Sequence, residues 1–194
     1  MKEKRVVIKV GTNVMTNKDN RIVGPILDEL VRQIAALYED GYAPVLVSSG
    51  SAIAGKEVLG ECIAKDDATR RQIYSSVGQP RMMRHYYSLF HDHGMRCAQI
   101  LATKRDFSPG KHRENMINCY EGLIAEGIVP IANEDDAVSL TMSMFSDNDE
   151  LASLVAELAK GAAKKNIPTY IANGKHKNVI VDILSGKDIG TKFY

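Results

Sequence analysis

The chain has 194 residues and a formal net charge of +1, and 44% of its residues are hydrophobic. This composition is typical of a globular domain that buries a hydrophobic core. There is no basic stripe for nucleic acid and no apolar run near the ~18 residues of a membrane span, so we expect neither partner. The first residues lack the apolar region of a signal peptide, and three widely spaced cysteines form no disulfide or zinc motif; together these features predict a cytoplasmic protein.

Strand and helix patterns alternate along the chain. Short apolar runs predict strands, and apolar residues spaced three or four apart predict helices. Gly41 is expected to cap the first long helix, and Gly78-Gln79-Pro80 marks a break or a bend between two helical stretches. In chain order we expect a strand at 6–10, a helix at 26–38, a strand at 43–47, helical stretches at 66–77 and 81–91, a strand at 97–102, a loop at 107–113, a helix at 114–125, a strand at 128–132, a helix at 149–165 and a strand at 169–172.

This alternation predicts a three-layer α/β/α sandwich with a mostly parallel central sheet, folded as one domain over residues 1–194. Ligands of such sheets bind at the carboxyl ends of the strands. Polar or glycine-containing clusters stand at three of these ends: Gly11-Thr12-Asn13, Ser48-Ser49-Gly50 and Asn133-Glu134-Asp135-Asp136.

Lys9 is a single charge inside the apolar first strand, two residues before Gly11. A charge at a buried strand end needs a partner, and a phosphate held by glycine backbone amides would supply one. The alternative is an edge strand whose lysine faces water. In Ser48-Ser49-Gly50, small residues would let the backbone approach an anionic ligand, and the alternative is a plain turn with serine as a helix N-cap.

Acids and amides gather in residues 133–136 and again in Asp147-Asn148-Asp149. Such clusters bind an ammonium group, hold Mg²⁺ or orient a lysine side chain. The alternative is a pair of solvated turns, with Asp149 as a simple N-cap. His91 and His93 have no further metal-ligating residue at a suitable spacing, so we predict no metal site there. No P-loop or dinucleotide fingerprint is present.

Taken together, these motifs resemble those of the glutamate 5-kinases in the amino acid kinase superfamily. The resemblance keeps order and spacing from residue 4 to about residue 152, and the single glycine of K-V-G argues against acetylglutamate kinases. The matching segments are I-K-V-G-T-N at 8–13, V-S-S-G at 47–50, S-V-G-Q at 76–79, P-I-A-N-E-D-D-A-V at 130–138 and S-D-N-D-E-L at 146–151.

The resemblance implies ATP-dependent phosphorylation of the γ-carboxylate of L-glutamate, the first step of proline biosynthesis, with Mg²⁺ accompanying ATP. It further implies a homo-oligomer that proline inhibits. In this family pattern Lys9 would stabilise the transferred phosphoryl group, and Asp149 would orient lysine side chains. The phosphates would be bound by Gly11, Thr12 and Gly50, and glutamate by Ser49, Asp136 and Asn148.

The sequence departs from the family pattern at two small positions and over one long segment. Asp135 stands where the family usually has asparagine, and residues 51–54 differ slightly. More importantly, the resemblance jumps near residues 154–156 to the family's late helix and strand. Roughly 50 to 70 residues, which include the adenine-binding loops and the second catalytic lysine, have no counterpart, and neither does the family's C-terminal PUA domain.

Two explanations of this jump are open: either a mobile nucleotide-binding lid has been left out of the sequence, or the chain carries a genuine deletion. Two further functions therefore stand beside the kinase. One is a catalytically inactive module that binds glutamate or proline, and the other is a sister kinase for another acidic amino acid.

Overall fold

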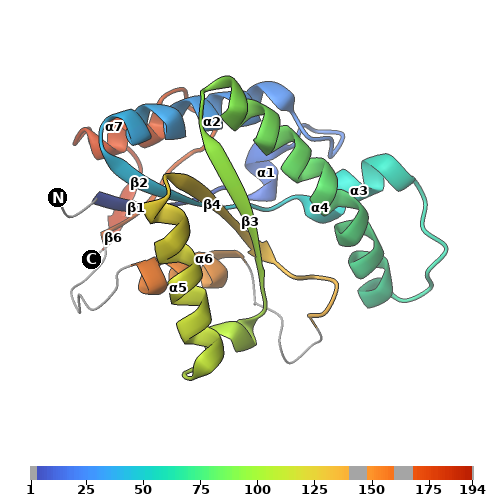
Figure 1. Ribbon diagram of the computed structural model, residues 1–194. Helices are drawn as coiled ribbons and strands as arrows, with labels where there is room; N and C mark the ends of the chain where they lie inside the picture. Colours follow the sequence, from blue (N-terminus) through green and yellow to red (C-terminus); the bar gives the residue numbers. More distant parts are fainter. Residues whose placement is uncertain (1–3, 140–147, 160–167, 194) are drawn as a thin grey trace.

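A computed structural model describes residues 4–139, 148–159 and 168–193. At its centre is a parallel sheet with the strand order β1-β2-β4-β3 (Figure 1). Its strands are β1 (Lys4–Lys9), β2 (Tyr42–Val47), β3 (Arg96–Ala102) and β4 (Ile128–Glu134). The helices are α1 (Thr12–Met15), α2 (Gly24–Glu39), α3 (Ser51–Leu59), α4 (Asp67–Asp92), the 3-10 helix η1 (Lys104–Phe107), α5 (Lys111–Ala125), α6 (Asn148–Ala159) and α7 (Val179–Leu184).

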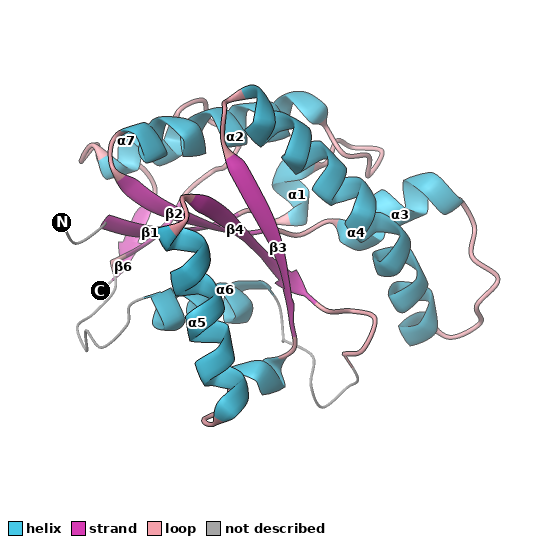
Figure 2. Ribbon diagram, in the orientation of Figure 1, coloured by secondary structure: helices cyan, strands magenta, loops and turns pink. Residues whose placement is uncertain are grey.

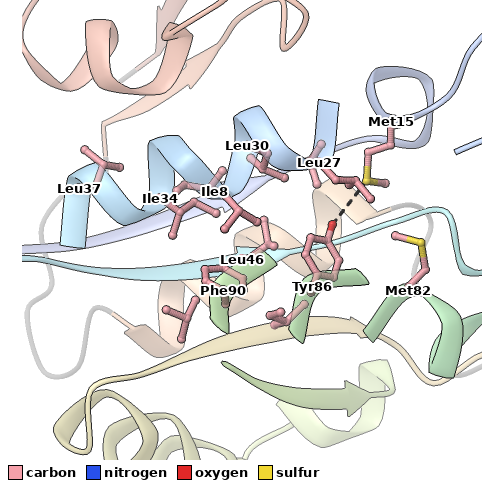
Figure 3. Packing of buried hydrophobic residues seen from close by; sticks show 14 of the residues in the cluster. Ile8, Met15, Leu27, Leu30, Ile34, Leu37, Leu46, Met82, Tyr86 and Phe90 are labelled. Atoms are coloured by element: carbon pink, nitrogen blue, oxygen red, sulfur yellow. Dashed lines mark hydrogen bonds between the residues drawn. The ribbon is translucent and has the colours of Figure 1, made fainter. Parts of the chain in front are cut away.

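Helices cover both faces of the sheet (Figure 2). Alternate residues of β2 point to opposite faces, so Leu46 joins a core with α2 and α4, whereas Val45 and Val47 join a core with α5 and α6. Figure 3 shows the first of these cores, in which Tyr86 and Phe90 of α4 are fully buried. The three-layer α/β/α arrangement confirms the predicted fold class.

The predicted central strands lie where the apolar runs placed them. A parallel sheet covered on both faces needs strands that are apolar throughout, and residues 43–47 of β2 are all buried. Gly41 ends α2 with a positive φ of 81°, and its N–H donates to the Tyr38 carbonyl, as a capping glycine does.

Helix α4 runs unbroken through Pro80, so the alternative of two separate helices is wrong. Gly78 is present for close packing. A Cβ on Gly78 would lie 1.8 Å from the Ser51 carbonyl oxygen, and a Cβ on Gly55 would lie 1.8 Å from the Tyr74 carbonyl oxygen. Helices α3 and α4 therefore cross with their backbones in contact, which only glycine at both positions allows.

Two other expectations need correction, and a third can be checked only in part. The predicted loop at 107–113 ends early, because Gly110 with a φ of 130° lets α5 begin at Lys111. The predicted last strand exists as β5 (Thr169–Ile171), but it pairs antiparallel with β6 (Thr191–Phe193) in a separate two-stranded sheet. Of the helix predicted at 149–165, residues 160–165 lie outside the described part. Within the described residues, no helix combines the length and hydrophobicity that crossing a membrane requires.

Candidate active site

The three polar clusters meet at one edge of the sheet, as predicted. Beyond the ends of the strands, the Val10 N–H donates to the Val47 carbonyl and the Ser48 N–H donates to the Ala132 carbonyl. The residues that follow β1, β2 and β4 therefore lie side by side. Asp135 is tied to the end of β3 in the same way, since its N–H donates to the Ala102 carbonyl at 2.9 Å.

The first turn of α6 joins these strand ends to one another. Asn148 Nδ2 donates to the Ser48 carbonyl at 2.8 Å and also to Ser49 Oγ. The next residue, Asp149, accepts from Lys9 Nζ at 2.6 Å. Glu150 then pairs with Lys104, which follows β3. Three consecutive residues of α6 thus contact the ends of three different strands. Asp147, which was predicted with them, lies outside the described residues.

Lys9 lies on an edge strand, as the alternative interpretation expected, and it also has a charged partner. It lies on β1, which is an edge strand of the central sheet, and 30% of its side chain is exposed. Its ammonium nevertheless has the partner Asp149 and lies above the backbone of Gly11, where an added Cβ would be 3.4 Å from Nζ. Thr12 begins α1, and its carbonyl accepts a hydrogen bond from Thr16 Oγ1 at 3.0 Å.

Gly50 opens helix α3 in a conformation that favours glycine. Its φ is 88°, and an added Cβ would lie 3.3 Å from the Met15 side chain. No side chain caps α3, so the interpretation of a serine N-cap is wrong. Uncapped N–H groups and the positive end of the helix dipole favour anions at a helix N-terminus. With Lys9 and the start of α6 at the same edge, this part of the site suits phosphate.

Tyr86 of α4 anchors the loop that precedes Gly50. Its hydroxyl lies 2.9 Å from Ser48 Oγ and donates to Met15 Sδ at 3.6 Å (Figure 3). Burial raises the pKa of Tyr86 to about 12, so the phenol stays protonated and neutral at physiological pH. The Ser48-Ser49-Gly50 loop is therefore fixed from inside the core.

Two carboxylates at the end of β4 are almost completely buried. The side chains of Glu134 and Asp136 are 3% and 7% exposed. Arg71 of α4 lies between them: its Nε donates to Asp136 Oδ1 at 2.8 Å, and its Nη2 donates to Glu134 Oε2 at 2.9 Å. The other oxygen of Asp136 lies 3.4 Å from Ser51 Oγ.

Sequence reasoning named Asp136 but missed Arg71 and the burial of Glu134. The available signal was the charge itself, because a carboxylate at a buried strand end needs a cationic partner. The pattern does not say which of the many upstream arginines supplies it. A cavity of about 250 Å³ opens beside both carboxylates, between α4, β3 and the turn after β4. It is somewhat smaller than typical pockets for drug-sized ligands and therefore suits a small metabolite.

The described residues do not fit a metal site of the protein's own. Within this part of the chain, no three His, Cys, Asp or Glu side chains gather closely enough to hold an ion. Three of the acids at the site are also paired with cations, since Arg71 holds Glu134 and Asp136, and Lys9 holds Asp149.

Comparison with known sequences identifies relatives. The chain is 43% identical to a glutamate 5-kinase of Chlorobaculum tepidum over 192 residues, covering 97% of this chain and 52% of the relative. It is 36% identical to one of Bacteroides thetaiotaomicron over 191 residues, covering 95% and 53%. The chain thus spans about half the length of these curated relatives.

A third relative aligns differently. A glutamate 5-kinase of Pelobacter propionicus is 27% identical over 253 aligned positions, which cover 99% of this chain and 68% of the relative. These 253 positions exceed the 194 residues of the chain, so at least 59 of them hold a residue of the relative with no counterpart here. The first two alignments have no such excess.

The fold has solved counterparts. A structure of isopentenyl phosphate kinase superposes with a TM-score of 0.62 over 97% of this chain and 100% of that chain, at 14% identity, which supports the fold alone. The sequence model described as the amino acid kinase family matches residues 4–168. Because this match covers most of the sequence, from β1 through α6, the chain belongs to the amino acid kinase family.

Proposed function

We propose that this chain binds L-glutamate and phosphorylates its γ-carboxylate with ATP, the first step of proline biosynthesis. The observation that carries the proposal is the first turn of α6. There, Asn148 and Asp149 connect the Ser49 loop to Lys9, so that a polar loop and a cation above glycine backbone lie at one site. Phosphoryl transfer needs such positioning and charge stabilisation more than it needs a covalent nucleophile.

In this proposal Lys9 stabilises the phosphoryl group as it moves from ATP to the substrate carboxylate. The Asp149 carboxylate holds the lysine side chain in place. The backbone around Gly11, Thr12 and Gly50 supplies N–H donors to the phosphate oxygens. A preorganised donor of this kind is typically worth about 10²- to 10³-fold in rate.

Glutamate would bind between the Ser48-Ser49-Gly50 loop and Asp136. Asp136 is buried and retains an oxygen whose contact with Ser51 is long, at 3.4 Å, so this oxygen can accept the α-ammonium group. The hydroxyl of Ser49 and the amide of Asn148 add polar contacts, and both are already oriented by their mutual hydrogen bond.

A second candidate function is a module that binds glutamate without turning it over. Helix α6 crosses residues 154–156 without interruption, and the Pelobacter propionicus relative carries at least 59 aligned residues that this chain lacks. The Pelobacter propionicus alignment supports an internal deletion, whereas the alignments with the Chlorobaculum tepidum and Bacteroides thetaiotaomicron relatives, which have no excess positions, do not. Because the described residues form no metal site, Mg²⁺ in the kinase would be bound only through the phosphates of ATP.

The two candidates separate in one pair of measurements on the purified chain. Calorimetric titration measures the affinity for L-glutamate, with proline as a competitor, and a coupled assay measures ADP release with L-glutamate, L-aspartate or N-acetyl-L-glutamate. Glutamate-dependent ADP release supports the kinase, whereas binding without release supports the binding module. Turnover of aspartate or acetylglutamate in place of glutamate would identify a sister kinase.

The Asp136→Ala variant tests the glutamate assignment. It should weaken glutamate binding or raise its KM about tenfold or more, since a charge-assisted contact is lost. The matched control is Asp135→Asn. Among the described residues, the Asp135 carboxylate accepts from the nearby Ala137 N–H at 3.3 Å and from no cation, so this variant should bind like the wild type. An unchanged KM in Asp136→Ala would remove Asp136 from the substrate site.

A further inference from the structure

Arg71 lies beside the buried carboxylates Glu134 and Asp136, and part of its side chain is exposed to solvent. Its guanidinium has five N–H groups in one plane. Nε donates to Asp136 and Nη2 donates to Glu134, and Nη2 also lies 2.8 Å from Asp136 Oδ1, so the two carboxylates lie on the side of Nε and Nη2. Among the described residues, Nη1 has no acceptor, and 47% of the side chain is exposed. The two carboxylates therefore orient an arginine whose outer edge faces away from them.

We propose that this outer edge of Arg71 binds the α-carboxylate of the substrate and thereby makes the site selective for α-amino acids. The inference deepens the proposed function and rests on it. A planar guanidinium matches the two oxygens of a carboxylate. Because Glu134 and Asp136 already fix the side chain, binding would cost little additional rotamer entropy.

The charges around Arg71 specify the kind of head group. Beside the Arg71 guanidinium, the buried Asp136 carboxylate keeps an oxygen whose contact with Ser51 is long, at 3.4 Å. An α-amino acid supplies an ammonium group for Asp136 and, one carbon away, a carboxylate for Arg71. A ligand without the ammonium group leaves Asp136 without this contact, and a ligand without the α-carboxylate leaves the outer edge of Arg71 facing water.

Arg70 provides a matched control from the same turn of α4. Its guanidinium bonds to Asp67 at 2.7 Å and to the carbonyls of Ala64 and Lys65, away from the strand ends. A substitution there removes the same charge from the same helix without touching Glu134 or Asp136.

The test compares three ligands by calorimetric titration. L-glutamate carries both head groups, 4-aminobutyrate lacks the α-carboxylate, and glutarate lacks the α-ammonium. We expect the wild type to prefer L-glutamate over 4-aminobutyrate by about tenfold to a hundredfold. In Arg71→Gln this preference should fall to a fewfold, while the preference over glutarate persists. Arg70→Gln should keep both preferences.

The outcomes separate this inference from a purely structural role. If Arg71→Gln keeps the wild-type preference over 4-aminobutyrate, or if Arg70→Gln loses it equally, the inference is wrong. Should Arg71→Gln not fold, Arg71→Lys retains a charge beside the carboxylates but lacks the fork, and it must still lose most of the preference. If the wild type binds no L-glutamate, the proposed function fails and the inference fails with it.

Discussion

Replacing Gly78 with alanine should push helix α4 away from helix α3 and disturb the loop that leads into α3. The added Cβ would lie 1.8 Å from the Ser51 carbonyl oxygen and 2.6 Å from the Gly55 nitrogen. Even a favourable C–H···O contact keeps its carbon and oxygen roughly 3.3 Å apart, so the helices must separate by about 1.5 Å. Both obstructing atoms belong to backbone, which cannot move aside by changing a rotamer.

The cost should lie at the upper end of the range for overpacking, at about 3 kcal/mol of unfolding free energy. For a chain of this size, that corresponds to a melting temperature lower by roughly 6 to 12 °C. Urea unfolding followed by circular dichroism measures the change. Gly122→Ala in α5 is the control, since nothing lies within 4 Å of its added Cβ, and it should be neutral or stabilising by up to about 1 kcal/mol. A Gly78→Ala protein as stable as the wild type would refute the close crossing of α3 and α4.

Three further predictions follow from the ion pairs and buried groups. Lys9→Ala should lower kcat for glutamate-dependent ADP release about 10²- to 10³-fold and leave the glutamate KM nearly unchanged, which steady-state kinetics would show. Burial raises the pKa of Tyr86 to about 12, so its stabilising contribution is complete below the ordinary pKa of about 10 and is lost as pH rises through 12. Tyr86→Phe should therefore flatten the stability profile between pH 10 and 12, and an unchanged alkaline profile would contradict this. It should also cost about 1 to 2 kcal/mol at neutral pH, because Ser48 Oγ loses its hydrogen bond with Tyr86 and keeps the longer one, at 3.3 Å, to the Ser49 carbonyl. Hydrogen bonding from Arg32 lowers the pKa of Glu29 to about 2, so its contribution is present above pH 4.5 and is lost as pH falls toward 2. Glu29→Gln should flatten the acid limb of the urea-unfolding profile, and an acid limb as steep as that of the wild type would argue against the pair.

The parts of the fold that follow from local pattern were predictable. The strand containing Lys9 and the strand before Ser48 are apolar runs closed by glycine or polar residues, and a parallel sheet brings such ends to one edge. That rule alone placed the loops of Gly11 and Gly50 and the cluster with Asp136 together, and the structure confirms it.

The rest depends on contacts between distant segments, which local pattern does not carry. Pro80 suggested a helix break, but α4 continues through it, and the nearby Gly78 packs against α3. Arg71 is one of several charged residues on an amphipathic helix, and by spacing alone it is typical of a solvated face. Only the folded chain shows that it lies between carboxylates 63 and 65 positions away.

In the proposed function, the strand-end site transfers a phosphoryl group from ATP to the γ-carboxylate of L-glutamate. The most direct test incubates the purified chain with both substrates and hydroxylamine, which traps an acyl phosphate as its hydroxamate. We predict that γ-glutamyl hydroxamate forms in the wild type and falls at least a hundredfold in Lys9→Ala. If no hydroxamate forms in the wild type, with L-glutamate at saturating concentration, this chain does not phosphorylate glutamate.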